Sequence, residues 1–187
     1  MPRRAGKSRD DAVAAITEIF REHGYEGASL SRLSEASGLG RSSLYHYFPK
    51  GKEDMAAAAL DRVGKIFAAE VIAPLRGDDP PAIRLGKALA AIERFYAGGE
   101  KACLIEQFGM SDAAAAAPGV AKAHTETLIG AFAATSRAAG FPAGEAKQRA
   151  EQAVVEIEGA LVVARALESK KPFSRALARL PDILLGA

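Results

Sequence analysis

Hydroxyl, aromatic and basic side chains are concentrated in one short stretch, residues 41–47. Arginine can contact the O6 and N7 atoms of guanine, and serine is short enough to let a helix approach the floor of the major groove. Tyrosine and histidine can hydrogen-bond to phosphates. The stretch therefore predicts recognition of double-stranded DNA. Its candidate contacts are Arg41, Ser42, Ser43, Tyr45, His46 and Tyr47. The alternative for each is a solvated surface residue, and for the two tyrosines partial burial.

Two short helices joined by a turn would present these side chains. Leu30, Leu33 and Ala36 recur at helical spacing and form one apolar face. Ser29 precedes that face with a hydroxyl suited to capping the helix, and its backbone N–H could also meet a phosphate. Gly38 can adopt the positive φ that ends the helix. A second helix that carries polar residues after such a turn is typical of a helix-turn-helix, which inserts this helix into the major groove.

The N-terminal third of the chain resembles the DNA-binding domain of TetR-type transcriptional regulators. The residues that carry the resemblance are Gly24–Ser29, Leu33, Gly38, Leu39, Leu44–Phe48 and Lys52. It implies a phosphate contact by Lys52 and an all-helical remainder. The connection Pro49–Lys52 looks one residue longer than usual, as in a sub-branch of drug-responsive repressors. Arg32 stands where the family commonly has an acidic residue.

Helical patterns cover nearly the whole chain, so we expect an all-α fold. Residues 1–52 would form a three-helix DNA-binding domain with a basic N-terminal arm, and residues 53–187 a domain for effector binding and dimerisation. A long helix from Glu53 to Pro74 would connect the two. The first helix should stop at Gly24. Further helices are expected at 82–96, 100–117, 120–139, 145–167 and 173–184, the last kinked at Pro181.

The last two helices have more apolar surface than one packing face requires. This surplus predicts a homodimer through a four-helix contact, as the resemblance also implies. The alternative is that both faces are covered within one chain. The candidate interface residues are Val154, Val155, Leu161, Val162, Ile183 and Leu184.

Bulky apolar residues with a few polar tips are spread over the helices of the second domain. They are typical of a pocket for a small apolar or aromatic effector, but equally of an ordinary core. The candidates are Phe67, Phe95, Tyr96, Cys103, Phe108, Met110, His124 and Phe132.

Signals for enzymatic chemistry are weak. His124 and Glu126 match the H-x-E of zinc deaminases, but the accompanying P-C-x-x-C is absent. Three histidines and one cysteine give no metal-ligand spacing, so neither a metal nor a cofactor is expected. Two rival hypotheses remain: a helical hydrolase that uses His124 with Glu126 or Ser111, and a DNA-organising protein without an effector.

Composition places few limits on function. The 25 basic and 23 acidic side chains give a net charge of only +2. Four of the basic residues, Arg3, Arg4, Lys7 and Arg9, cluster in an N-terminal arm. This arm could neutralise phosphates, or it could act only as a solubilising tail. One cysteine fits a reducing cytoplasm. No signal peptide and no run of about 18 apolar residues is found. We therefore expect a cytoplasmic regulator, most simply a repressor that occupies a palindromic operator and is released by its effector.

Overall fold

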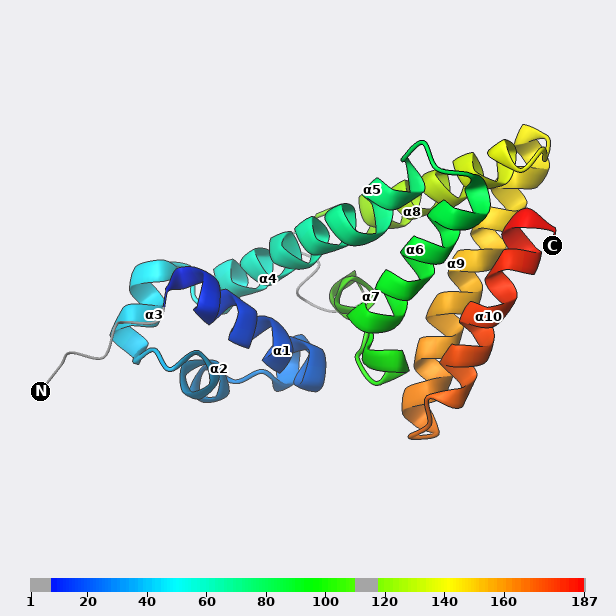
Figure 1. Cartoon of the computed structure of the whole chain (residues 1–187). Helices are drawn as coiled ribbons and strands as arrows, with labels where there is room; N and C mark the ends of the chain where they lie inside the picture. The colour runs from blue at the N-terminus through cyan, green and yellow to red at the C-terminus, as the bar shows by residue number, and fades with distance from the viewer. Residues whose placement is uncertain (1–7, 110–117, 187) are drawn as a thin grey trace, which may run out of the picture. The chain divides into compact units, whose positions relative to one another are not determined.

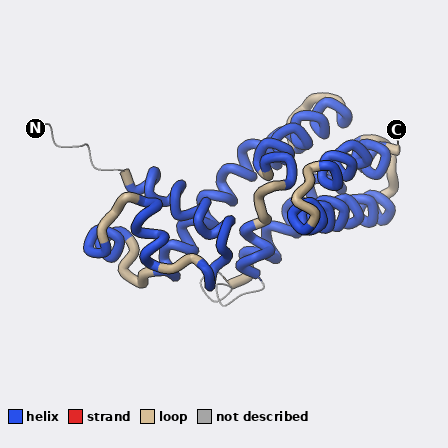
Figure 2. Tube along the Cα trace, turned by 90° about the horizontal axis from the view of Figure 1, so that it is seen from below, coloured by secondary structure: helices blue, strands red, loops and turns tan. Residues whose placement is uncertain are grey.

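The computed structural model describes residues 8–109 and 118–186, and within these ranges the chain contains helices and loops but no strand (Figure 2). The all-α expectation is confirmed. No helix of the described residues is long and apolar enough to cross a membrane. The helices are α1 (Arg9–Gly27), α2 (Leu30–Ser37), α3 (Arg41–Tyr47), α4 (Lys52–Phe67), α5 (Ala73–Leu75), α6 (Pro81–Phe95), α7 (Leu104–Gly109), α8 (Val120–Ala138), α9 (Ala143–Ala166) and α10 (Lys171–Leu185).

The chain divides into two compact units. The first consists of Met1–Gly64 and Leu104–Ala121, and the second of Lys65–Cys103 and Lys122–Ala187. The start of α4 belongs to the first unit, and Met55 in this part of the helix is buried. A packing boundary therefore lies later than the division at residue 53 that the motif suggests. A functional division at residue 53 stays a prediction.

Helix α1 supplies the core of the first unit. It packs against α2 and α7, and its residues Ile16 and Phe20 are fully buried. The Ser8 side chain caps it by accepting a hydrogen bond from the backbone of Asp11, whose carboxylate accepts one from the backbone of Ser8. Gly24 interrupts the helix with φ +68°. Regular helix thus stops where the sequence predicted, and a glycine makes the left-handed conformation accessible.

The long helix that begins at Lys52 extends further than expected. A π-helical turn, Ala68–Ile72, follows α4 and leads directly into α5, which ends at Leu75. The prediction that Pro74 ends the helix was wrong by one residue. In the π-helical turn the N–H of Ala73 donates to the carbonyl of Ala68, five residues earlier, so the hydrogen bonding has already changed register before proline, which lacks a donor, is reached.

Helices α9 and α10 form the main packing pair of the second unit, and α10 also contacts α6 (Figure 1). Ile157 and Leu161 of α9 and Phe173 and Leu180 of α10 are buried. Helix α10 passes through Pro181 and continues to Leu185. The buried apolar residues of α9 and α10 therefore belong to the core of the second unit.

The segment after α6 differs from the expected helix at 100–117. A 3₁₀ turn, Ala97–Gly99, is followed by loop residues, and helix resumes only at Leu104. In this turn Gly99 has a φ of +101°, and an added Cβ there would lie 2.7 Å from the Cβ of Phe173. Glycine therefore allows this turn to approach α10 closely. Residues 110–117, which include Met110 and Ser111, lie outside the described residues.

Candidate DNA-binding site

The turn between α2 and α3 has the geometry that the sequence predicted. Ser29 caps α2 by accepting a hydrogen bond from the N–H of Arg32 at 3.3 Å, and Gly38 ends it with φ +68°. The Ser34 hydroxyl donates to the carbonyl of Leu39 at 2.6 Å and so fixes the chain beyond the turn. These local bonds set the direction in which α3 leaves the turn.

Helix α3 has one buried side and one exposed side. Leu44, and Phe48 just beyond the helix, are buried and anchor it to the first unit. The side chains that could contact DNA lie on the other side. Five of the predicted contacts are exposed, namely Arg41, Ser42, Ser43, Tyr45 and His46. The buried anchors thus hold a polar and basic face towards solvent.

The two tyrosines of α3 occupy different environments. Tyr45 is 49% exposed, and its ring lies beside Gly51, where an added Cβ would be 3.4 Å from Cε1. Tyr47 is half-buried, with its ring centre 5.5 Å from that of His46 and 6.4 Å from that of Phe48. The alternative of partial burial therefore applies to Tyr47, whereas Tyr45 is exposed.

Lys52 is the first residue of α4 and is held by α1. Its ammonium donates to the carbonyl of Glu26 at 3.3 Å and lies 4.5 Å from the centre of the Tyr25 ring. These two contacts pre-orient the charge. The neighbouring Lys50, which the sequence analysis did not single out, is exposed, and its backbone N–H donates to the Asp54 carboxylate at 2.8 Å. Only its position in the turn after α3 could have indicated it.

Two further cations complete the description of this surface. Arg9 lies with its guanidinium 5.4 Å from the centre of the Phe48 ring, close to the end of α3. Arg32 donates from Nη1 to the carbonyl of Gly27, so it ties α2 to the end of α1. The rest of the basic arm, with Arg3, Arg4 and Lys7, lies outside the described residues.

We predict that Lys52→Ala weakens binding to all DNA sequences alike. A lysine that neutralises one phosphate releases one counterion, so the slope of log affinity against log salt should become shallower by about one per subunit. Affinities measured at several salt concentrations test this, with Lys52→Arg as the charge-retaining control. A change in base preference in Lys52→Ala would contradict a phosphate contact.

The predicted effector residues separate into two groups. Phe67, Phe95, Tyr96 and His124 form a ring cluster in the second unit: the centres lie 5.5 Å apart for Phe67–Phe95, 5.0 Å for Phe95–Tyr96 and 4.7 Å for Phe67–His124. Phe108 instead packs against Phe20, at 5.1 Å, and belongs to the core of the first unit. The structure thus does not place Phe108 with the cluster, because α7 packs against α1.

The remaining effector candidates are core-like. Cys103 and Phe132 are buried in the second unit. Two pockets formed by described residues of this unit are lined by other side chains, from the turn after α6 and from α9 and α10. Cys103 and Phe132 therefore have the burial of ordinary core residues, and an effector contact by either stays a prediction.

Burial within the ring cluster lowers the pKa of His124 below its ordinary value of 6.5. As the pH falls, His124 is therefore protonated in the unfolded chain before it is protonated in the folded protein. The free energy of unfolding rises with pH between the two pKa values. We expect a lower free energy of unfolding at about pH 5.5 than at about pH 7.5, with a smaller difference in His124→Leu. Urea unfolding at both pH values tests this. An unchanged difference in His124→Leu, or an equal change in the exposed-site control His46→Gln, would contradict it.

The positions of His124 and Glu126 do not support the hydrolase hypothesis. Residues two apart on a helix do not face each other. His124 contacts Phe67, whereas the exposed Glu126 pairs with Lys122 at 3.9 Å. Among the described residues no group of three histidine, cysteine or acidic side chains could hold a metal ion.

The predicted dimer residues are partly exposed and partly internal. Val155 is 71% and Val162 47% exposed on α9, whereas Ile183 is half-buried. The other three candidates, Val154, Leu161 and Leu184, are buried within the chain itself. Leu184 is therefore not surplus apolar surface as predicted, and Val154 and Leu161 belong to the core of the single chain, so the burial of these three does not support an interface role.

The exposed side of this helix pair also forms a groove of about 370 Å³. Val155, Gly159 and Val163 of α9 line it together with Arg175 and Arg179 of α10. Arg179 forms an ion pair with Glu156 at its side. Leu167, also missed by the sequence analysis, is exposed at the end of the same helix. Small residues in its lining, among them Gly159, would permit the close approach of another helix.

Comparison with known proteins places this arrangement in a family. Residues 12–59 match the family model described as bacterial regulatory proteins, tetR family. The regulator YxaF of Bacillus subtilis is 38% identical over 61 residues, 33% of this chain and 32% of that protein. Rv0196 of Mycobacterium tuberculosis, an uncharacterised HTH-type transcriptional regulator, is 27% identical over 95% of this chain and 94% of its own. The chain matches only about a third of the length of the relatives at 38% identity.

The fold agrees over the whole chain. A solved structure of a cysteine mutant of the TetR-family regulator CifR, complexed with 26-base-pair operator DNA, matches with a TM-score of 0.74 and 23% identity, covering 98% of both chains. The helix-turn-helix geometry, the family model and the shared fold agree. Residues 12–59 thus match the DNA-binding domain of the tetR family of bacterial regulatory proteins, and the chain as a whole has the fold of TetR-family regulators.

Proposed function

We propose that the protein is a DNA-binding transcriptional repressor, acting in the cytoplasm on a palindromic operator. The observation that carries the proposal is the exposed face of α3, where Arg41, Ser42, Ser43, Tyr45 and His46 are held away from the core by buried Leu44 and Phe48. A short helix with this distribution fits the major groove. The operator complex of CifR and the regulators among the relatives support the same activity.

A homodimer is the second part of the proposal. Val155, Val162 and Val163 are exposed on α9 and lie at helical spacing on one side. Exposed apolar residues beside a groove favour an isologous contact in which two α9–α10 pairs form four helices. A two-fold dimer would present two α3 helices to two half-sites, and this requires operator symmetry.

Release by an effector is the third part. The ring cluster of Phe67, Phe95, Tyr96 and His124 lies at the end of α4, whose first turns belong to the DNA-binding unit. An apolar or aromatic compound that binds better to one position of α4 would change operator affinity, and operator would change effector affinity by the same factor. The π-helical turn directly after Phe67 marks a place where helix register can differ.

The experiment is to measure binding of the purified protein to an operator duplex selected from random DNA. Fluorescence anisotropy at several salt concentrations, with sedimentation of the complex, should show sequence-selective, salt-dependent binding by two chains per operator. Addition of apolar compounds should then lower operator affinity, and Phe67→Leu should alter that response without altering affinity in their absence. Binding that is equally tight on unrelated duplexes would instead support a DNA-organising protein.

A further inference from the structure

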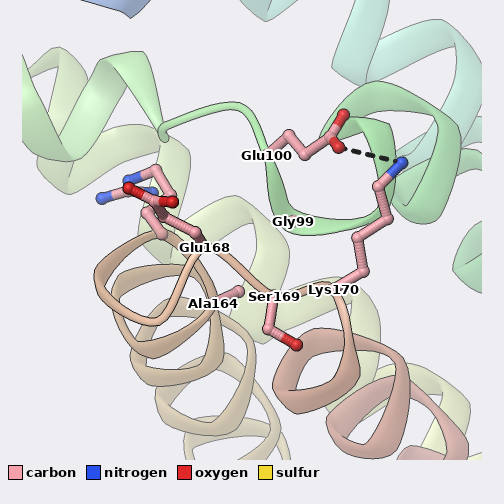
Figure 3. A pocket seen from close by; sticks show the side chains of 7 residues that line it. Gly99, Glu100, Ala164, Glu168, Ser169 and Lys170 are labelled. Carbon is pink, nitrogen blue, oxygen red and sulfur yellow. Dashed lines mark ion pairs between the residues drawn. The ribbon is translucent and has the colours of Figure 1, made fainter.

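A pocket of about 340 Å³ lies at the junction of α9 and α10, within the second unit (Figure 3). Two segments line it: the turn after α6, with Gly99 and Glu100, and the end of α9 with the following turn. Its volume lies within the range of small-molecule sites. It is lined by none of the residues of the aromatic cluster around Phe67. The charged lining residues are Glu100, Arg165, Glu168 and Lys170.

Two of the four charges neutralise each other. The ammonium of Lys170 lies 3.1 Å from a carboxylate oxygen of Glu100, and this pair joins the two segments at the pocket (Figure 3). Arg165 and Glu168 remain. Within residues 8–109 and 118–186, neither of their side chains makes a hydrogen bond or an ion pair, and Nη1 of Arg165 is buried without a partner. The pocket therefore presents one cation and one anion that have no ion-pair partner among the described residues; Arg165 is half-buried and Glu168 is exposed.

Glu168 has a strained backbone conformation. Its φ is +48°, and the N–H of Glu168 donates to the carbonyl of Arg165 while that of Ser169 donates to the carbonyl of Ala164. These two bonds define a Schellman motif, in which the left-handed position is usually glycine. A glutamate there is unfavourable for the fold alone.

We propose that this pocket binds a small zwitterion of the α-amino acid type. The guanidinium of Arg165 would receive the ligand carboxylate, for which its planar donors are suited, and the carboxylate of Glu168 would receive the ligand ammonium. The Lys170–Glu100 pair borders the site and leaves the other two groups for the ligand. A ligand with a single charge would satisfy only one of the two. This is a second small-molecule site, independent of the effector cluster.

The test is calorimetric titration of the full chain with L-alanine, L-serine and L-leucine. For the strongest of the three, the matched compounds lacking either the ammonium or the carboxylate serve as single-charge probes; for leucine these are 4-methylpentanoate and 3-methylbutylamine. At least one amino acid should bind saturably, and both single-charge probes should bind about tenfold or more weakly. Absence of saturable binding by all three amino acids, or equal binding of a single-charge probe, would overturn the proposal.

Variants separate binding from folding. Arg165→Gln and Glu168→Gln should each weaken amino-acid binding about tenfold or more. Glu168→Gly should abolish it while leaving the unfolding temperature unchanged or higher, because glycine relieves the positive φ. Glu151→Gln, the same change at an exposed site on α9, should bind as the unmodified protein does. Retained binding in Glu168→Gly, or its loss in Glu151→Gln, would refute the assignment.

Discussion

Replacement of Arg41 by alanine is expected to relax base preference at one symmetric pair of operator positions. Arg41 is exposed at the first position of α3, where a side chain can reach base edges in the major groove. Loss of a bidentate contact to guanine costs about 1–3 kcal/mol per half-site, or about 5- to 150-fold in affinity. Affinities for a set of duplexes that differ only at the paired positions would show the unmodified protein discriminating and the variant not.

The matched control is Lys50→Ala, which removes the same charge from an exposed position two residues after Phe48. It should weaken all duplexes by a similar factor and leave the ranking of bases unchanged. If Arg41→Ala also lowered every affinity equally, Arg41 would be a phosphate contact, and base recognition would have to be assigned to other residues of the exposed face.

Introduction of a charge on α9 is expected to separate the proposed dimer into monomers. Val155 is 71% exposed and lines the groove between α9 and α10. In an isologous contact both subunits carry the Val155→Glu substitution at the interface, so two unpaired carboxylates would lose their water. We expect the affinity between subunits to fall by about 100-fold or more, with helical content retained because the residue is exposed in the single chain. Sedimentation velocity at micromolar concentration measures the change.

Ile83→Glu provides the comparison, since Ile83 is also an exposed large apolar residue, at 51%, but lies on α6 outside this groove. It should leave the dimer intact. Operator affinity should fall in Val155→Glu and stay unchanged in Ile83→Glu, because two half-sites are bound together only by a dimer. An unmodified protein that sediments as a monomer at micromolar concentration would end this part of the account.

The N-terminal third could be predicted closely because its signals are local. Ser29 caps α2, Gly24 and Gly38 take positive φ, and Leu44 and Phe48 anchor α3, all as their types and spacing indicate. Each of these features depends on residues only a few positions apart. The tetR family model matches residues 12–59, within the same third of the chain.

Predictions that depended on packing between distant segments were less successful. Leu161 and Leu184 have the apolar character of an interface residue, yet neighbouring helices of the same chain cover them. Phe108 has the aromatic character of the effector cluster, but it packs against Phe20. Periodicity tells which residues are buried and not which element buries them. The close approach of Gly99 to Phe173 is a contact of this kind, and the helix expected from residue 100 begins only at Leu104.

The central claim is that a two-fold dimer reads a palindromic operator through α3, and selection of bound fragments from a random DNA pool tests it most directly. Repeated binding, elution and sequencing with the unmodified protein should enrich one inverted repeat. Its half-site centres should be separated by about 34–36 Å along the duplex, or a multiple of this spacing, as two α3 helices in successive major grooves require. The same selection with Arg41→Ala should lose preference at one symmetric pair of positions. Enrichment of a single asymmetric half-site, or of no sequence at all, would contradict the account.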